Sequence, residues 1–120
     1  MNMIKKLISE YNACGMKEEL EGTTTFYEAA SCHYWNKNNI CIKRRHQRKH
    51  LPNARLYAYA NLLSASKNKL EECKDFEALK QAIDEIKFKG IGDLTRYDIA
   101  VAIGYLQNPT ILPEKYVYLH

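Results

Sequence analysis

One stretch of the chain carries all of its excess positive charge. Residues 36–56 contain seven basic residues and no acidic one, whereas residues 1–35 have three basic and five acidic groups and residues 57–120 have eight and nine. The basic side chains of this segment are Lys37, Lys43, Arg44, Arg45, Arg48, Lys49 and Arg55. Such a concentration of positive charge attracts polyanions, above all nucleic acid. A solvated basic loop without a ligand is the simpler alternative.

Two histidines, His46 and His50, lie within the basic segment. Imidazole titrates near neutral pH, so the pair has the chemistry of general acids and bases or, once protonated, of phosphate ligands. With a carboxylate from Asp98 or Glu114, the pair would make an enzyme that acts on nucleic acid or a nucleotide. Because no nucleophile accompanies the pattern, surface histidines in a basic run are the simpler interpretation.

A zinc site made of Cys32, Cys41, His46 and His50 is the metal alternative. The histidine spacing suits zinc, but eight residues separate the two cysteines, where about two to four are usual. The neighbouring cations would also oppose a dication. We therefore expect reduced thiols, no metal and no cofactor.

Residues 83–106 form the most specific pattern in the chain. An apolar segment ends at Phe88, Gly90-Ile91-Gly92 follows, and a second apolar segment starts at Leu94. Glycines permit a sharp turn and a close approach of backbone to ligand, and the apolar residue between them would anchor the turn. The first amides of the second helix then point outward, where the helix dipole favours an anion.

This pattern resembles the helix-hairpin-helix motif of DNA repair and recombination proteins. The resemblance implies a phosphate site formed by the Gly90-Ile91-Gly92 turn, duplex DNA as the partner, and no sequence readout. It also places Thr95 where the motif often has a small hydroxyl residue. Lys89 and Arg96 flank the turn, and Asp93 would either repel a phosphate or cap the helix. A structural corner, in which the glycines serve only as caps, is the alternative.

The helix-hairpin-helix DNA glycosylases are the best-known enzymes with this motif, and the chain departs from their pattern. Leu94 stands where their lyase members have a lysine, which leaves no candidate for Schiff-base chemistry. Glu114 is the one carboxylate near the position of their catalytic aspartate. Glycosylase or lyase activity is therefore disfavoured.

A second resemblance joins the basic segment to the hairpin. His46-Gln47-Arg48, Gly90–Asp98 and Val117–His120 are similar to blocks of a small bacterial family without an established activity. The resemblance covers residues 43–120 and implies that the two regions belong to one site. It also implies that the pattern continues beyond His120.

Apolar residues at helical spacing predict the elements that must position these residues. The expected helices are residues 3–13, a helix opened by a Thr25 capping box and continuing through Trp35, one from Pro52 to about Leu70, one from Asp75 through Ile86, and one from Leu94 to Leu106. The last has two possible inward faces, one with Leu94, Tyr97, Val101 and Tyr105 and one with Ile99, Ala102, Ile103 and Leu106. Ile40–Ile42 is a short apolar run that is either extended or the lead into the basic segment.

Four aromatic residues accompany the basic segment: Tyr34, Trp35, Tyr57 and Tyr59. Such side chains stack nucleic-acid bases when they are exposed. Aromatic residues at helical spacing are more often part of the core, and Tyr57 is expected inward with Leu56, Ala60 and Leu63.

Length and composition are those of one globular domain. The chain has 120 residues, 46% hydrophobic and 27% charged, which predicts a single all-α domain of about five helices over residues 1–120. No apolar run has the length of a membrane-spanning helix, and the first residues make a poor signal peptide, so we expect a cytoplasmic protein without a membrane partner.

The sequence as a whole favours a non-enzymatic domain that binds nucleic acid, first of all duplex DNA. The expected binding residues are Lys43, Arg44, Arg45, Arg48, Lys49, Lys89, Gly90, Ile91, Gly92, Thr95 and Arg96. The alternatives are the enzyme described above and a protein-interaction module whose basic segment meets an acidic partner. Oligomeric state and the choice between DNA and RNA stay open.

Overall fold

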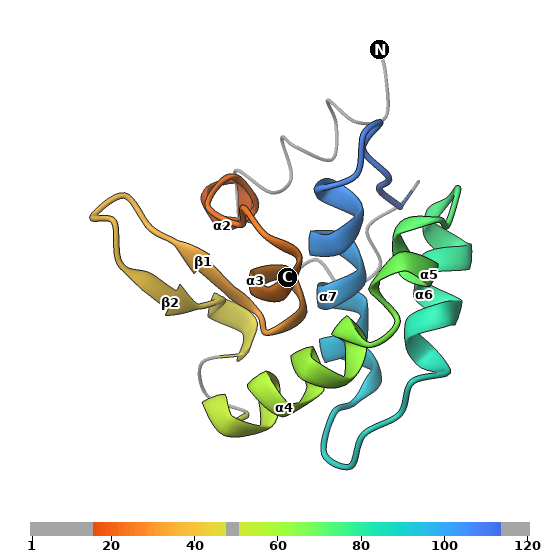
Figure 1. Ribbon diagram of the computed structural model, residues 1–120. Coiled ribbons are helices and arrows are strands. Elements are labelled where there is room, and N and C mark those ends of the chain that lie inside the picture. Colours follow the sequence, from red (N-terminus) through yellow and green to blue (C-terminus); the bar gives the residue numbers. More distant parts are fainter. Residues whose placement is uncertain (1–15, 48–50, 114–120) are drawn as a thin grey trace.

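A computed structural model describes residues 16–47 and 51–113 (Figure 1). This part of the chain is mostly helical, which confirms the expected class in its coarser form. Its elements are α2 (Met16–Glu21), α3 (Phe26–Ala30), β1 (His33–Trp35), β2 (Cys41–Lys43), the 3-10 helix η1 (Arg45–Gln47), α4 (Asn53–Ser64), α5 (Lys67–Glu71), α6 (Phe76–Asp84) and α7 (Asp93–Tyr105). The helix expected over residues 3–13 lies outside the described residues. None of the described helices is long and apolar enough to cross a bilayer.

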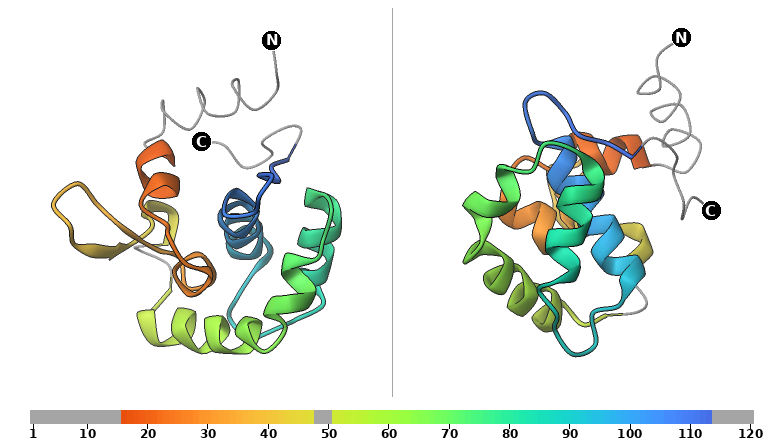
Figure 2. Two further views of the ribbon diagram at one scale, coloured as in Figure 1. Left: turned by 45° about the horizontal axis from the view of Figure 1, so that its top comes forward. Right: turned by 90° about the vertical axis from the view of Figure 1, so that its right-hand side faces the viewer.

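Helix α7 is the centre of the core. It packs against α6 on one side and α3 on the other, and α4 packs in turn on α3 (Figures 1 and 2). Both predicted inward faces of α7 are buried in part, because the helix is enclosed from two sides. The residues that confirm them are Tyr97, Val101, Ile99, Ala102 and Ile103, whereas Leu94 is exposed.

Helix α3 begins where the sequence predicts and ends earlier. The Thr25 hydroxyl accepts a hydrogen bond from the Glu28 N–H at 3.1 Å, as an N-cap does. The helix stops at Ala30, because Cys32 takes a left-handed conformation with φ of 62°. The expected continuation through Trp35 is therefore wrong, and residues 33–35 form a strand instead.

Strands β1 and β2 form an antiparallel hairpin, with Trp35 opposite Cys41 and His33 opposite Lys43. The turn is made by Asn36, whose side-chain oxygen accepts from the Ile40 N–H at 3.0 Å, and by Asn39, which has φ of 59°. Asparagine tolerates this conformation better than most residues. The ambiguous run at residues 40–42 is thus extended for most of its length.

Helix α4 begins at Asn53 and ends at Ser64, so the expected single helix to Leu70 is in fact two, α4 and α5. Leu56, Ala60 and Leu63 are buried as predicted. Tyr57 is 38% exposed, which corrects its expected inward position.

Helix α6 has the most regular sequence pattern and follows the prediction closely. The Asp75 carboxylate accepts from the Ala78 N–H at 2.8 Å, and Leu79 and Ile83 are fully buried. The helix ends at Asp84, and Ile86 packs on the core from the loop that follows.

Candidate nucleic-acid interface

The loop between α6 and α7 contains a tight turn centred on Lys89 and Gly90. The Ile91 N–H donates to the Phe88 carbonyl at 3.0 Å, and Gly90 has φ of 90°. A positive φ at the third residue is the mark of a type II turn, which favours glycine there. Ile91 is buried in the core cluster, so it anchors the turn as the sequence predicts.

The first turn of α7 leaves backbone amides without partners inside the helix. Gly92 is the N-cap and provides no side chain, and the Arg96 N–H is the one that bonds back to the Gly92 carbonyl at 3.1 Å. The N–H groups before Arg96 have no such partner in the helix. Gly92 is exposed, and a Cβ there would meet no atom within 4 Å. A ligand can therefore approach the backbone of this turn.

Arg96 and Asp93 belong to an ion-pair network that ties α6 to the start of α7. Arg96 Nε lies 2.7 Å from Asp84, and its Nη1 donates to the Ile91 carbonyl at 2.8 Å. Lys80 lies 2.8 Å from both Asp84 and Asp93. Partial burial alone would raise the pKa of Asp84, but hydrogen bonds from Lys80 and Arg96 lower it. Arg96 thus holds the turn in place, and the Asp93 charge is balanced by nearby cations.

Arg44 is buried, which corrects its expected contact with phosphate. Its side chain is 2% exposed, with Nε 3.1 Å from Asp98 Oδ2 and Nη2 donating to the Ala29 carbonyl at 3.2 Å. Burial alone would lower the pKa of Arg44, but the Asp98 charge raises it, so the guanidinium stays charged. Its Nη1 is buried without a partner among the described residues.

Gln47 connects the same carboxylate to the first turn of α7. Its Nε2 lies 3.5 Å from Asp98 Oδ2, and its Oε1 accepts from the Thr95 hydroxyl at 3.0 Å. Thr95 is buried, so its hydroxyl is not directed at a phosphate as expected. Asp98 is a buried anchor for Arg44 and Gln47, which leaves it unsuited to act as the free general base of the enzymatic alternative.

The Glu19 carboxylate binds the backbone of the basic segment at Arg45. The sequence pattern did not point to this residue. It is buried, and its Oε2 accepts from the Arg45 N–H at 2.8 Å. Burial raises the pKa of Glu19; the Arg45 N–H opposes the rise, and the charge of Asp98 adds to it. A carboxylate in an acidic run such as Glu18-Glu19 gives no local signal that its side chain is buried.

Arg55, from the first turns of α4, lies against the α6–α7 turn. It is exposed, and its guanidinium occupies the space that a Cβ at Gly90 would need. Lys89 is exposed in the same turn. Arg45 is exposed on η1, and the Lys43 ammonium donates to the Leu51 carbonyl. The structure thus brings Arg55 to the turn that contains Lys89, and the Gln47 side chain links η1 to the first turn of α7.

Several predicted residues lie outside what the structure describes: Arg48, Lys49, His50, Glu114 and the side chain of His46. Of the proposed zinc ligands, Cys32 is fully buried, and burial raises its thiol pKa to about 12. Within residues 16–47 and 51–113, no group of three or more potential ligands is arranged to hold a metal ion.

Comparisons with known proteins return no match to a protein-family model, a curated protein or a solved structure. The helix-hairpin-helix resemblance therefore stays a prediction from the sequence.

Proposed function

We propose that the protein binds the phosphate backbone of nucleic acid, with little sequence preference, where the α6–α7 turn meets the basic segment. The observation that supports the proposal is the buried network of Arg44, Gln47, Thr95 and Asp98. It joins a segment rich in cations to the start of α7, although the two are far apart in the sequence. Two features that each attract phosphate thus share one region of the surface.

Backbone and side chains have different tasks in this proposal. The amides before Arg96 receive a phosphate oxygen at the helix N-terminus, where the dipole favours negative charge. Arg55 and Lys89, with no ion-pair partner among the described carboxylates, supply positive charge beside the turn. Arg45, Arg48 and Lys49 add the longer-range attraction. Arg44 and Arg96 hold the scaffold.

Phosphate contacts carry no sequence information by themselves. The helix-hairpin-helix resemblance makes duplex DNA the first ligand to test. The protein-interaction alternative differs from the proposal in one measurable respect, because it requires no affinity for nucleic acid at low salt.

Salt dependence of binding tests the proposal. We would measure fluorescence anisotropy of a labelled DNA duplex at several salt concentrations with wild type and with the Arg55→Ala/Lys89→Ala variant. Each lost phosphate contact lowers the slope of log affinity against log salt by about 0.9, so the double variant should lose about 1.8.

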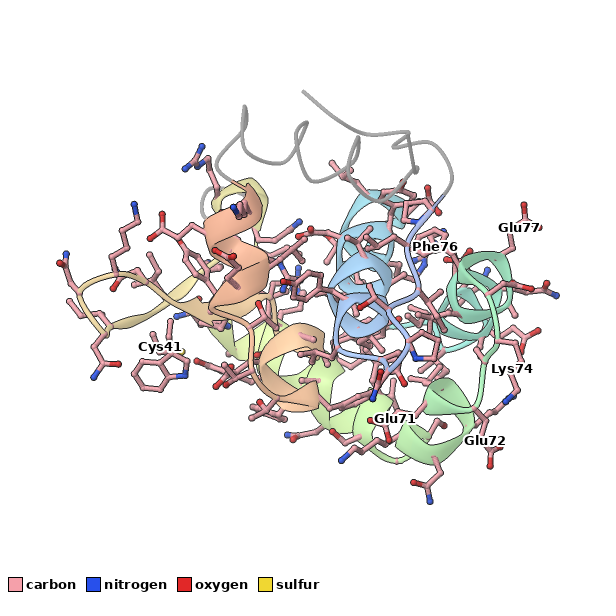
Figure 3. All side chains as sticks on the ribbon, turned by 90° about the horizontal axis from the view of Figure 1, so that it is seen from above. Cys41, Glu71, Glu72, Lys74, Phe76 and Glu77 are labelled. Carbon is pink, nitrogen blue, oxygen red and sulfur yellow. The ribbon has the colours of Figure 1, made fainter. Side chains whose placement is uncertain are left out.

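The matched control is Lys69→Ala/Lys74→Ala, which removes the same charge from exposed positions on α5 and before α6. Figure 3 shows Lys74 at the end of the molecule opposite Cys41 and the β1–β2 hairpin. We expect its slope to match wild type. Equal losses in both variants would mean that net charge alone matters, and no binding at low salt would exclude the proposal.

A further inference from the structure

Three aromatic rings form a parallel stack beside the basic segment. The rings of Tyr27 and Tyr57 have centroids 6.0 Å apart and planes within 5°, and the rings of Tyr57 and His33 are 4.9 Å apart and within 14°. Tyr27 is 39% exposed and Tyr57 38% exposed. Tyr27 comes from α3 and Tyr57 from α4, so tertiary packing rather than helical spacing brings them together.

Trp35 lies two residues after His33 on the same strand. Alternate residues of a strand share a face, so His33 and Trp35 point to the same side of β1. His33 stacks on Tyr57 there, while Trp35 is 41% exposed. Tyr34, on the other side of the strand, is buried near Gly22. We call Tyr27, Trp35 and Tyr57 the aromatic face.

The indole of Trp35 is held in position by Glu28. Its Nε1 donates to Glu28 Oε2 at 2.7 Å, and the other carboxylate oxygen accepts from the Thr24 N–H at 2.8 Å. A ring fixed in this way loses little conformational freedom when a ligand stacks on it. The Glu28 charge repels phosphate, so a bound strand would place its bases over the rings and its backbone away from Glu28.

Positive charge lies beside the stacked rings, on the same side of the hairpin as His33. Lys43 pairs with His33 across the strands, and its ammonium donates to the carbonyl of Leu51, just before α4. Arg45 follows on η1. Helix α4 carries both Tyr57 of the aromatic face and Arg55, which lies beside Gly90 in the region proposed above to bind phosphate.

We propose that the aromatic face binds unpaired bases, so that the preferred ligand is single-stranded nucleic acid rather than a duplex. The inference rests on the proposed phosphate site. Exposed aromatic side chains next to cations are what proteins use to stack successive bases without reading their identity. Bases in a duplex are already stacked on each other and cannot use these rings.

Trp35 is the one tryptophan of the chain, so its fluorescence reports on this face directly. We would titrate the protein with oligo(dT), with an abasic oligonucleotide of the same length, and with a duplex. We expect oligo(dT) to quench Trp35 emission and to bind at least about fivefold more tightly than the abasic strand. The abasic strand should bind through phosphate alone and leave the emission nearly unchanged.

Variants separate the rings from the fold. Tyr27→Leu/Tyr57→Leu should lose at least about fivefold in affinity for oligo(dT) while its affinity for the abasic strand is retained. Tyr57→Phe keeps the ring and should bind like wild type. Leu62→Ala, at an apolar residue of α4 that is 40% exposed, is the control. Thermal melts confirm that each variant is folded before it is compared.

The outcomes distinguish the two proposals. If oligo(dT) and the abasic strand bind equally and Trp35 emission does not change, the phosphate site stands and the aromatic face is not part of it. If no oligonucleotide binds at low salt, both proposals fail. If the tyrosine variants bind oligo(dT) like wild type although folded, the stacking role is refuted, and a protein partner becomes the alternative for this face.

Discussion

Replacing Asp98 by Asn tests whether the buried ion pair holds the basic segment to α7. The substitution keeps the size of the side chain and removes the charge that faces Arg44. The Arg44 side chain is 2% exposed and the Asp98 side chain 10% exposed, so water cannot replace the lost partner without opening the core. Arg44 would keep the Ala29 carbonyl as its acceptor at 3.2 Å.

The expected cost follows from this burial. Removing one partner of a buried ion pair costs about 3–5 kcal/mol, because it leaves a buried charge uncompensated. Total stability of a domain is about 5–15 kcal/mol, so the loss is a large part of it. At roughly 4 °C per kcal/mol for a chain of this size, the melting temperature should fall by about 12–20 °C.

Urea denaturation followed by circular dichroism measures the cost. In a double-mutant cycle, Arg44→Met with Asp98→Leu should cost less than the sum of the two single changes, because the double variant buries no unpaired charge from this pair. Lys69→Met is the control, since the Lys69–Glu85 pair is 70% and 60% exposed. We expect that control to stay within about 0.5 kcal/mol of wild type. A cost of Asp98→Asn no larger than that of Lys69→Met would show that the buried pair does not stabilise the fold.

Three further predictions use other parts of the structure. Gly90→Ala should destabilise the protein by about 1–2 kcal/mol, because φ there is 90°. Gly92→Ser, at an N-cap in open space with φ of −93°, should stay within about 0.5 kcal/mol of wild type; equal effects in thermal melts would contradict the described turn. Glu19→Gln should stabilise the protein at neutral pH, since burial raises the pKa of Glu19. The gain should shrink as the pH falls through that raised pKa, because the wild-type carboxyl is then protonated in the folded state. A gain in stability that does not depend on pH would contradict this cause. In the folded protein at pH 8, iodoacetamide should modify exposed Cys41 and spare buried Cys32, and peptide mapping that finds Cys32 modified first would show that its burial is wrong.

Local signals in the sequence were sufficient to predict where two of the helices begin and which residues form much of the core. Asp75 and Thr25 cap the helices that they were expected to open, because an N-cap bond joins residues three apart. The end of α3 was not predictable in the same way. Cys32 adopts a left-handed conformation that its residue type does not favour, and the strand that follows is stabilised by pairing with β2.

The candidate site was predicted in part. The tight turn at Gly90 was predictable because glycine readily adopts a positive φ, and the apolar Ile91 beside it was expected to be buried. Arg44 was misassigned because it stands in a run of exposed cations, while its partner Asp98 is 54 residues away and gives no local signal. Arg55 gained its place beside Gly90 through tertiary packing, which periodicity cannot show.

Backbone amide shifts test the central claim most directly. We would titrate isotope-labelled protein with a short DNA at low salt and follow every amide in proton–nitrogen correlation spectra. The proposal predicts that the largest shifts occur at Asp93, Leu94 and Thr95, whose N–H groups form the open first turn of α7, with smaller shifts at Lys89 and Arg55. Shifts confined to α5 and the start of α6, or no shifts at all, would contradict it.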